Sequence, residues 1–204
     1  MNFLKTTIAV AFTALTFTAQ AQDKAMLDAF SQSYTQEAAG KYDAAAASLL
    51  KVYDATSYET NMRLGWLYHL SAKSKEALPY YKKAISLMPN ATEPLWAIIM
   101  PLAGLENWVE VEQHYLAILK FDANNSVANY LLGLVYYYRK DYVKAKKYFD
   151  ISINLYPFDY NNMLMSGWNN YFLGNKNEAR ILFSKTLLFN PKDASAQEGM
   201  RLTK

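Results

Sequence analysis

The chain has 204 residues, of which 52% are hydrophobic, 15% aromatic and 19% charged. This composition excludes a disordered tail and is sufficient for a sizeable core. The absence of cysteine excludes a disulfide framework, a thiolate metal site, a cysteine nucleophile and a lipidated cysteine anchor. A formal net charge of +3 is too small to argue for nucleic-acid binding.

The first 21 residues have the three regions of a secretory signal peptide. Lys5 supplies the positive charge, residues 8–17 form an apolar stretch, and Ala19-Gln20-Ala21 is a small-x-small cleavage pattern. An apolar stretch of about ten residues is too short for a membrane span, which needs roughly twenty. We therefore predict cleavage after Ala21 and a periplasmic or secreted protein without a membrane span. The alternative is a retained amphipathic anchor.

A period of 34 residues runs through the rest of the chain. Gly133 and Gly167 are one period apart, and Gly65 lies two periods before Gly133. Further columns keep the same register: Ala77, Ala145 and Ala179; Tyr81, Tyr115, Phe149 and Phe183; Pro89, Pro157 and Pro191. So many columns in one register indicate a true repeat.

Each repeat divides into two amphipathic helices. In the fourth repeat the pattern predicts helices over residues 127–139 and 142–155, and Pro157 ends the second because proline cannot continue a helix. Ala145 and Phe149 are four residues apart and therefore lie on one buried stripe of that second helix.

These residues and their spacing resemble the tetratricopeptide repeat, and in particular an exported bacterial-type member of that family. The second repeat carries the signature in Leu64, Gly65, Tyr68, Ala77, Tyr81, Ala84 and Pro89. The resemblance implies an all-α fold, a right-handed α-solenoid of about five helix-turn-helix repeats with a short C-terminal capping helix. One domain would span residues 22–204, with repeats at 26–57, 58–91, 92–125, 126–159 and 160–193 and the cap at 194–204.

Members of this family line a concave groove with the first helices of their repeats, so the resemblance implies which residues face a partner. In the first helix of the fourth repeat, the side away from the second helix is also apolar, which favours burial on both faces or binding. The predicted groove consists of Met62, Trp66, His69, Trp96, Met100, Tyr130, Leu134, Tyr137, Tyr138, Leu164, Trp168 and Tyr171, and Phe30 and Tyr34 extend it into the first repeat. The alternative is that neighbouring first helices pack against each other through these residues.

The sequence offers little material for catalysis or for a cofactor. The two histidines, His69 and His114, fall in different repeats, so no metal site is expected. The chain has neither a strained nucleophile elbow nor a glycine-rich phosphate loop. We therefore expect a protein that is not an enzyme and binds no cofactor.

Relatives that hold chaperone tails use a clamp of Lys, Asn and Arg, but the matching places here are Met62, Trp66, Glu93, Ala97 and Val127. A peptide with apolar anchors fits this groove better. We predict an adaptor, scaffold or assembly factor that binds another envelope or secreted protein. Two alternatives stay open: a glycan-binding module, whose aromatic rings would stack on sugars, and a scaffold that self-associates into homo-oligomers.

Overall fold

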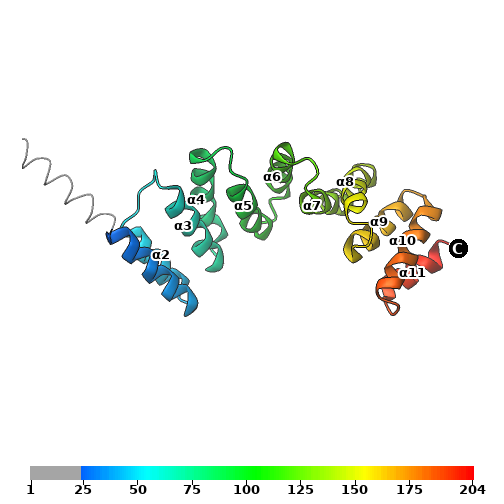
Figure 1. Ribbon diagram of the computed structural model, residues 1–204, viewed down its shortest axis with the longest axis horizontal. Helices are drawn as coiled ribbons and strands as arrows, with labels where there is room; N and C mark the ends of the chain where they lie inside the picture. Colours follow the sequence, from blue (N-terminus) through cyan, green and yellow to red (C-terminus); the bar gives the residue numbers. More distant parts are fainter. Residues whose placement is uncertain (1–23) are drawn as a thin grey trace, which may run out of the picture. The chain divides into compact units, whose positions relative to one another are not determined.

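The computed structural model describes residues 24–204, and the signal peptide predicted for residues 1–21 lies outside this range. Over the described residues the chain consists of helices joined by short turns, which confirms the all-α class (Figure 1). The chain divides after Leu105 into two compact units, which we call the N-terminal and the C-terminal unit. Within residues 24–204, none of the helices is long and apolar enough to cross a membrane.

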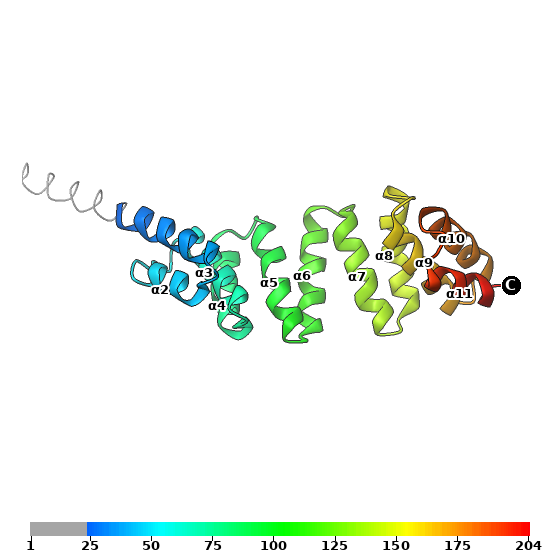
Figure 2. The ribbon, with the colours of Figure 1, turned by 90° about the horizontal axis from the view of Figure 1, so that it is seen from below.

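The N-terminal unit begins with a helix of residues 24–38. It continues with α2 (Tyr42–Leu50), α3 (Tyr58–Leu70), α4 (Ser74–Leu87) and α5 (Glu93–Gly104). From α2 onwards each helix packs against the next one along the chain, and α3 also contacts α5 (Figure 2). The first helices of neighbouring repeats therefore lie side by side.

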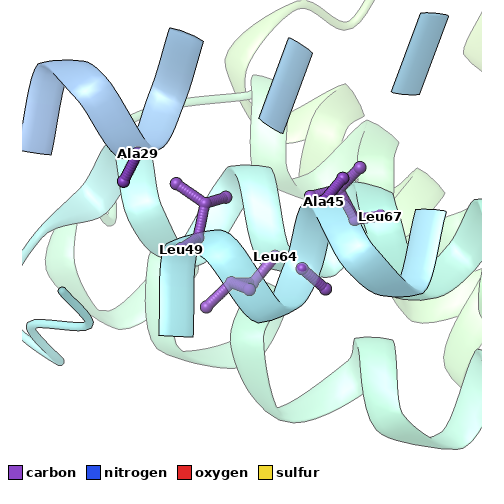
Figure 3. Close-up of a cluster of buried hydrophobic side chains, with 6 residues drawn as sticks. Ala29, Ala45, Leu49, Leu64 and Leu67 are labelled. Carbon is purple, nitrogen blue, oxygen red and sulfur yellow. The ribbon is translucent and has the colours of Figure 1, made fainter. Parts of the chain in front are cut away.

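A hydrophobic cluster holds the first three helices of this unit together. Leu49 of α2 and Leu64 and Leu67 of α3 are fully buried, and Ala29 of the first helix and Ala45 of α2 pack with them (Figure 3). Burial of large aliphatic side chains contributes roughly 1.5–3 kcal/mol each. This cluster fixes the helix of residues 24–38 onto α3, which positions the site described below.

The C-terminal unit contains α6 (Trp108–Phe121), α7 (Ser126–Tyr138), α8 (Tyr142–Leu155), α9 (Tyr160–Phe172), α10 (Lys176–Phe189) and α11 (Ala194–Leu202). Successive helices pack together, and the contacts of α9 with α7 and with α11 again join alternate helices. Helix α8 has the bounds predicted from the periodicity, and α7 begins and ends one residue before the predicted range. The predicted capping helix is α11.

The glycines of the repeat are explained by close contact between the two helices of each pair. A Cβ atom at Gly65 would lie 2.8 Å from the ring of Tyr81, and one at Gly133 would lie 2.6 Å from the ring of Phe149. Real Cβ atoms are not found so close to another heavy atom, so a larger residue would push the helices apart. Both rings are 1% exposed, and the 34-residue period therefore records a packing requirement.

The turn between the two helices of a repeat contains one residue in the left-handed conformation. This position is occupied by Gly40, Ala72, Glu106, Lys140 and Gly174. After Ala72, the N–H of Lys73 donates to the carbonyl of Tyr68 across 2.9 Å, which closes a Schellman motif. Equivalent bonds follow three of the other turn residues. The helix ends are thus satisfied by backbone groups.

Candidate partner-binding groove

A groove of about 640 Å³ lies on the N-terminal unit between the helix of residues 24–38, α3 and α5. Most of its wall is aromatic or apolar: Phe30, Tyr34, Tyr58, Met62, Trp66, Tyr81, Trp96 and Ala97. Its charged lining residues are Glu59, Arg63 and Glu93. The structure therefore brings together Met62, Trp66 and Trp96 of the predicted groove, with Phe30 and Tyr34 from the first repeat.

Trp66 is the most open of the large residues on α3. Its side chain is 42% exposed, and its indole N–H donates to Oε1 of Glu37 across 2.8 Å. This bond joins α3 to the helix of residues 24–38 and holds the ring in one orientation. A large aromatic side chain that is already ordered loses little entropy when a partner covers it.

Arg63 supports the floor of the groove. It is 8% exposed, and it forms an ion pair with Glu37. Its Nε donates to the hydroxyl of Ser33 across 3.0 Å, and its guanidinium lies 3.8 Å from the centre of the Tyr34 ring. A buried charge needs such partners, so Arg63 ties α3 to the preceding helix.

The rim of the groove is closed by a bond between the starts of α3 and α5. The phenol of Tyr58 donates to Oε2 of Glu93 across 2.8 Å. Burial, together with the Glu93 carboxylate, raises the pKa of Tyr58 to about 12, so the phenol keeps its proton and keeps donating into the alkaline range. On the same rim, the hydroxyl of Ser57 donates to Glu59 across 3.2 Å.

Two further predicted residues of this unit, His69 and Met100, do not line the groove. The imidazole of His69 lies 6.0 Å from the Trp66 ring, centre to centre, and burial lowers its pKa. Met100 of α5 is 59% exposed. His69 is therefore a neighbour of Trp66 outside the lining of the groove.

In the C-terminal unit, the predicted residues of α9 pack against their neighbours. The indole N–H of Trp168 donates to the hydroxyl of Ser195 across 2.9 Å, and its ring lies 5.0 Å from that of Phe183, centre to centre. Leu164 and Tyr171 pack with Trp168 against the buried cluster that contains Phe183. These three residues therefore contribute to the contact between α9, α10 and α11.

The predicted residues of α7 make similar contacts. Tyr130 lies 5.9 Å from Phe149, centre to centre, and Tyr137 lies within 6.0 Å of both Tyr142 and Phe172. Burial is the main cause that raises the pKa of Tyr130 and of Tyr137 to about 12. Leu134 is half-buried, while Tyr138 is 74% exposed.

The polar part of the groove was not predicted from the sequence. Glu37, Tyr58 and Glu59 were missed because charged and hydroxyl-bearing residues at helix starts and ends are common on solvated surfaces. Glu37 lies 29 residues before Trp66, which departs from the 34-residue period, so the repeat does not reveal their contact. The sequence feature that could have indicated the polar part of the groove is the position of Tyr58 and Glu93 at the starts of the first helices of two successive repeats.

The described residues contain no group of three or more His, Cys, Asp or Glu side chains that could hold a metal ion. The ionisable groups of the groove are instead paired with one another or with hydroxyl groups. The arrangement is therefore suited to recognition by surface contact.

Residues 58–90 and residues 127–159 each match the tetratricopeptide repeat model. These matches, together with the helix pairs, define a helix-turn-helix repeat protein. Residues 58–90 and 127–159 are thus identified as tetratricopeptide repeats, and the fold is that of tetratricopeptide repeat proteins. No curated protein sequence matches the chain.

Several solved structures have a similar fold. The chain is similar to a tetratricopeptide repeat protein from Parabacteroides merdae, with 21% identity and a TM-score of 0.75 over 88% of this chain and 72% of that one. It is similar to the MamA protein, with 21% identity and a TM-score of 0.73 over 84% and 95%. For YrrB, described as a tetratricopeptide repeat protein with an unusual peptide-binding site, the identity is 15% and the TM-score 0.72 over 91% and 97%. At these identities the likeness concerns the fold.

Proposed function

We propose that the chain is an exported adaptor, scaffold or assembly factor that binds another protein through the groove of its N-terminal unit. The observation that carries this proposal is the open aromatic wall formed by Tyr34, Trp66 and Trp96 on three separate helices. Export is proposed on the signal-peptide pattern of residues 1–21.

The family supports an interaction role, because tetratricopeptide repeats in general form non-catalytic scaffolds for protein binding. The peptide-binding site named for YrrB supports the same class of ligand. The groove also has the features of a binding surface, since Tyr34 and Trp66 are exposed and Trp66 is held in place before any partner arrives. A segment with apolar side chains would cover these rings.

The proposal can be tested by affinity capture from an envelope extract, followed by calorimetry with the captured protein. The bait is the full chain with a C-terminal tag, compared with a Trp66→Ala/Trp96→Ala variant. We expect each tryptophan to contribute about 2 kcal/mol to binding, roughly thirtyfold in affinity. The matched control is Trp108→Ala, because Trp108 is 47% exposed on α6 and does not line the groove.

A partner that is retained by the native chain and by the Trp108 variant, and lost by the double variant, would support the proposal. A partner retained equally by all three chains would place the binding surface outside the groove. If a panel of oligosaccharides displaces the partner or binds alone with tryptophan-dependent affinity, the glycan alternative replaces it. A molecular mass that rises with concentration would favour self-association.

A further inference from the structure

The positive charge in the groove is already neutralised within the protein. Arg63 is the cationic residue of the lining, and it has an ion pair with Glu37, a bond to Ser33 and a contact with Tyr34, while its Nη2 is buried without a hydrogen-bond partner. At 8% exposure it is also hidden from solvent. An anionic ligand would have to move the side chains that cover this guanidinium in order to reach it.

The negative charges on the rim are not neutralised in this way. Glu59 and Glu93 are exposed residues in the first turns of α3 and α5. The groups that donate to them are the hydroxyl of Ser57 and the phenol of Tyr58, and neither brings a positive charge. The groove thus presents two carboxylates, although the whole chain has a net charge of +3.

The aromatic wall beside these carboxylates suits a particular side chain. The Trp66 ring is 42% exposed and held by Glu37, so it offers an ordered aromatic surface to an incoming group. Lysine and arginine pack their alkyl stems on apolar surfaces, and their cationic heads are attracted both to aromatic faces and to carboxylates. A cation with an apolar neighbour would satisfy both kinds of residue at once.

We infer that the groove selects a cationic peptide segment, in which a lysine or arginine adjoins an apolar anchor. This inference rests on the proposed function and specifies its ligand. The apolar anchor covers Met62, Trp66 or Trp96, and the cation lies over the rim formed by Glu59 and Glu93. Because the chain as a whole is cationic, long-range attraction would favour anionic ligands; selection of a cation must therefore come from the groove itself.

The probe is a phage-displayed library of random dodecapeptides, selected on the immobilised full chain and depleted on the Trp66→Ala/Trp96→Ala variant. We expect the enriched sequences to carry Lys or Arg within a few positions of Leu, Ile, Met or an aromatic residue. Synthetic peptides of the consensus are then titrated by calorimetry at two salt concentrations. A Glu59→Gln/Glu93→Gln variant should bind them about tenfold more weakly and with less dependence on salt.

The matched control is Glu76→Gln. Glu76 is also an exposed glutamate in the first turn of a helix, α4, but it does not line the groove. The Glu76→Gln variant should bind the consensus peptides as the unmodified chain does. Enrichment of acidic peptides, or of neutral peptides that the rim variant binds with full affinity, would overturn the inference and leave groove binding intact. Failure to enrich any groove-dependent peptide would count against both the inference and the proposed function.

Discussion

Trp66 and Trp168 occupy the same position of the repeat, three periods apart, yet they have different surroundings. The indole of Trp66 donates to Glu37 of the preceding repeat and forms a wall of an open groove. The indole of Trp168 donates to Ser195 of the following helix, and its ring packs on Phe183. An equivalent position in a repeat therefore does not imply an equivalent role. The N-terminal unit uses this position at a candidate binding surface, and the C-terminal unit uses it for packing.

The largest expected effect is on the free energy of unfolding, which should distinguish the packing role of Trp168 from the surface role of Trp66. Trp168→Ala should cost about 3 kcal/mol, at the lower end for a large-to-small core substitution because the ring is only partly buried. Trp66→Ala should cost about 1 kcal/mol, since 42% of this residue is already exposed to water. Hydrogen exchange of α3 and of α9, measured by mass spectrometry, gives both values. Equal losses in the two variants would contradict the comparison.

A smaller effect is expected for the ion pair beneath the groove. Glu37→Ala leaves the buried Arg63 without its carboxylate and should cost about 2 kcal/mol, less than for a fully buried pair because Glu37 is partly exposed. Asp43→Ala is the matched control, because Asp43 pairs with Lys73 across 2.8 Å at the surface. There we expect no measurable change. Urea unfolding followed by circular dichroism measures the free energy of unfolding of both variants. If Glu37→Ala costs as little as Asp43→Ala, Arg63 does not depend on Glu37.

The smallest expected effect is the loss of stability at acid pH that is caused by protonation of His69. Burial lowers the pKa of His69 below 6.5 in the folded chain, so protonation favours unfolding. The contribution of the neutral His69 to the free energy of unfolding is fully present above pH 6.5 and decreases as the pH falls below that value. The equivalent position in the C-terminal unit is Tyr171, so this histidine has no counterpart there. Thermal unfolding at pH 7.5 and 5.5 should show a smaller decrease for His69→Gln than for the unmodified chain; equal decreases would exclude this role for His69.

The sequence was sufficient to predict the structural features that depend on the 34-residue period. The contact of Gly133 with Phe149 and the bounds of α8 follow from residues that recur every 34 positions. The sequence did not distinguish Trp66 from Trp168, because periodicity assigns a position and not its neighbours. It also missed the contact between Glu37 and Trp66, because a period does not indicate which side chains of neighbouring first helices meet.

The left-handed turns have a consequence for the surface of the molecule. The turn position is exposed in each described repeat, and it carries glycine, alanine, glutamate or lysine with a similar backbone conformation. Schellman hydrogen bonds close this turn after Gly40, Ala72, Lys140 and Gly174, whatever the side chain. The residue at this position can therefore vary, from Gly40 and Ala72 to Lys140, while the backbone turn is kept. This edge of the repeats is a place where new electrostatic character can be introduced while the core stays as it is.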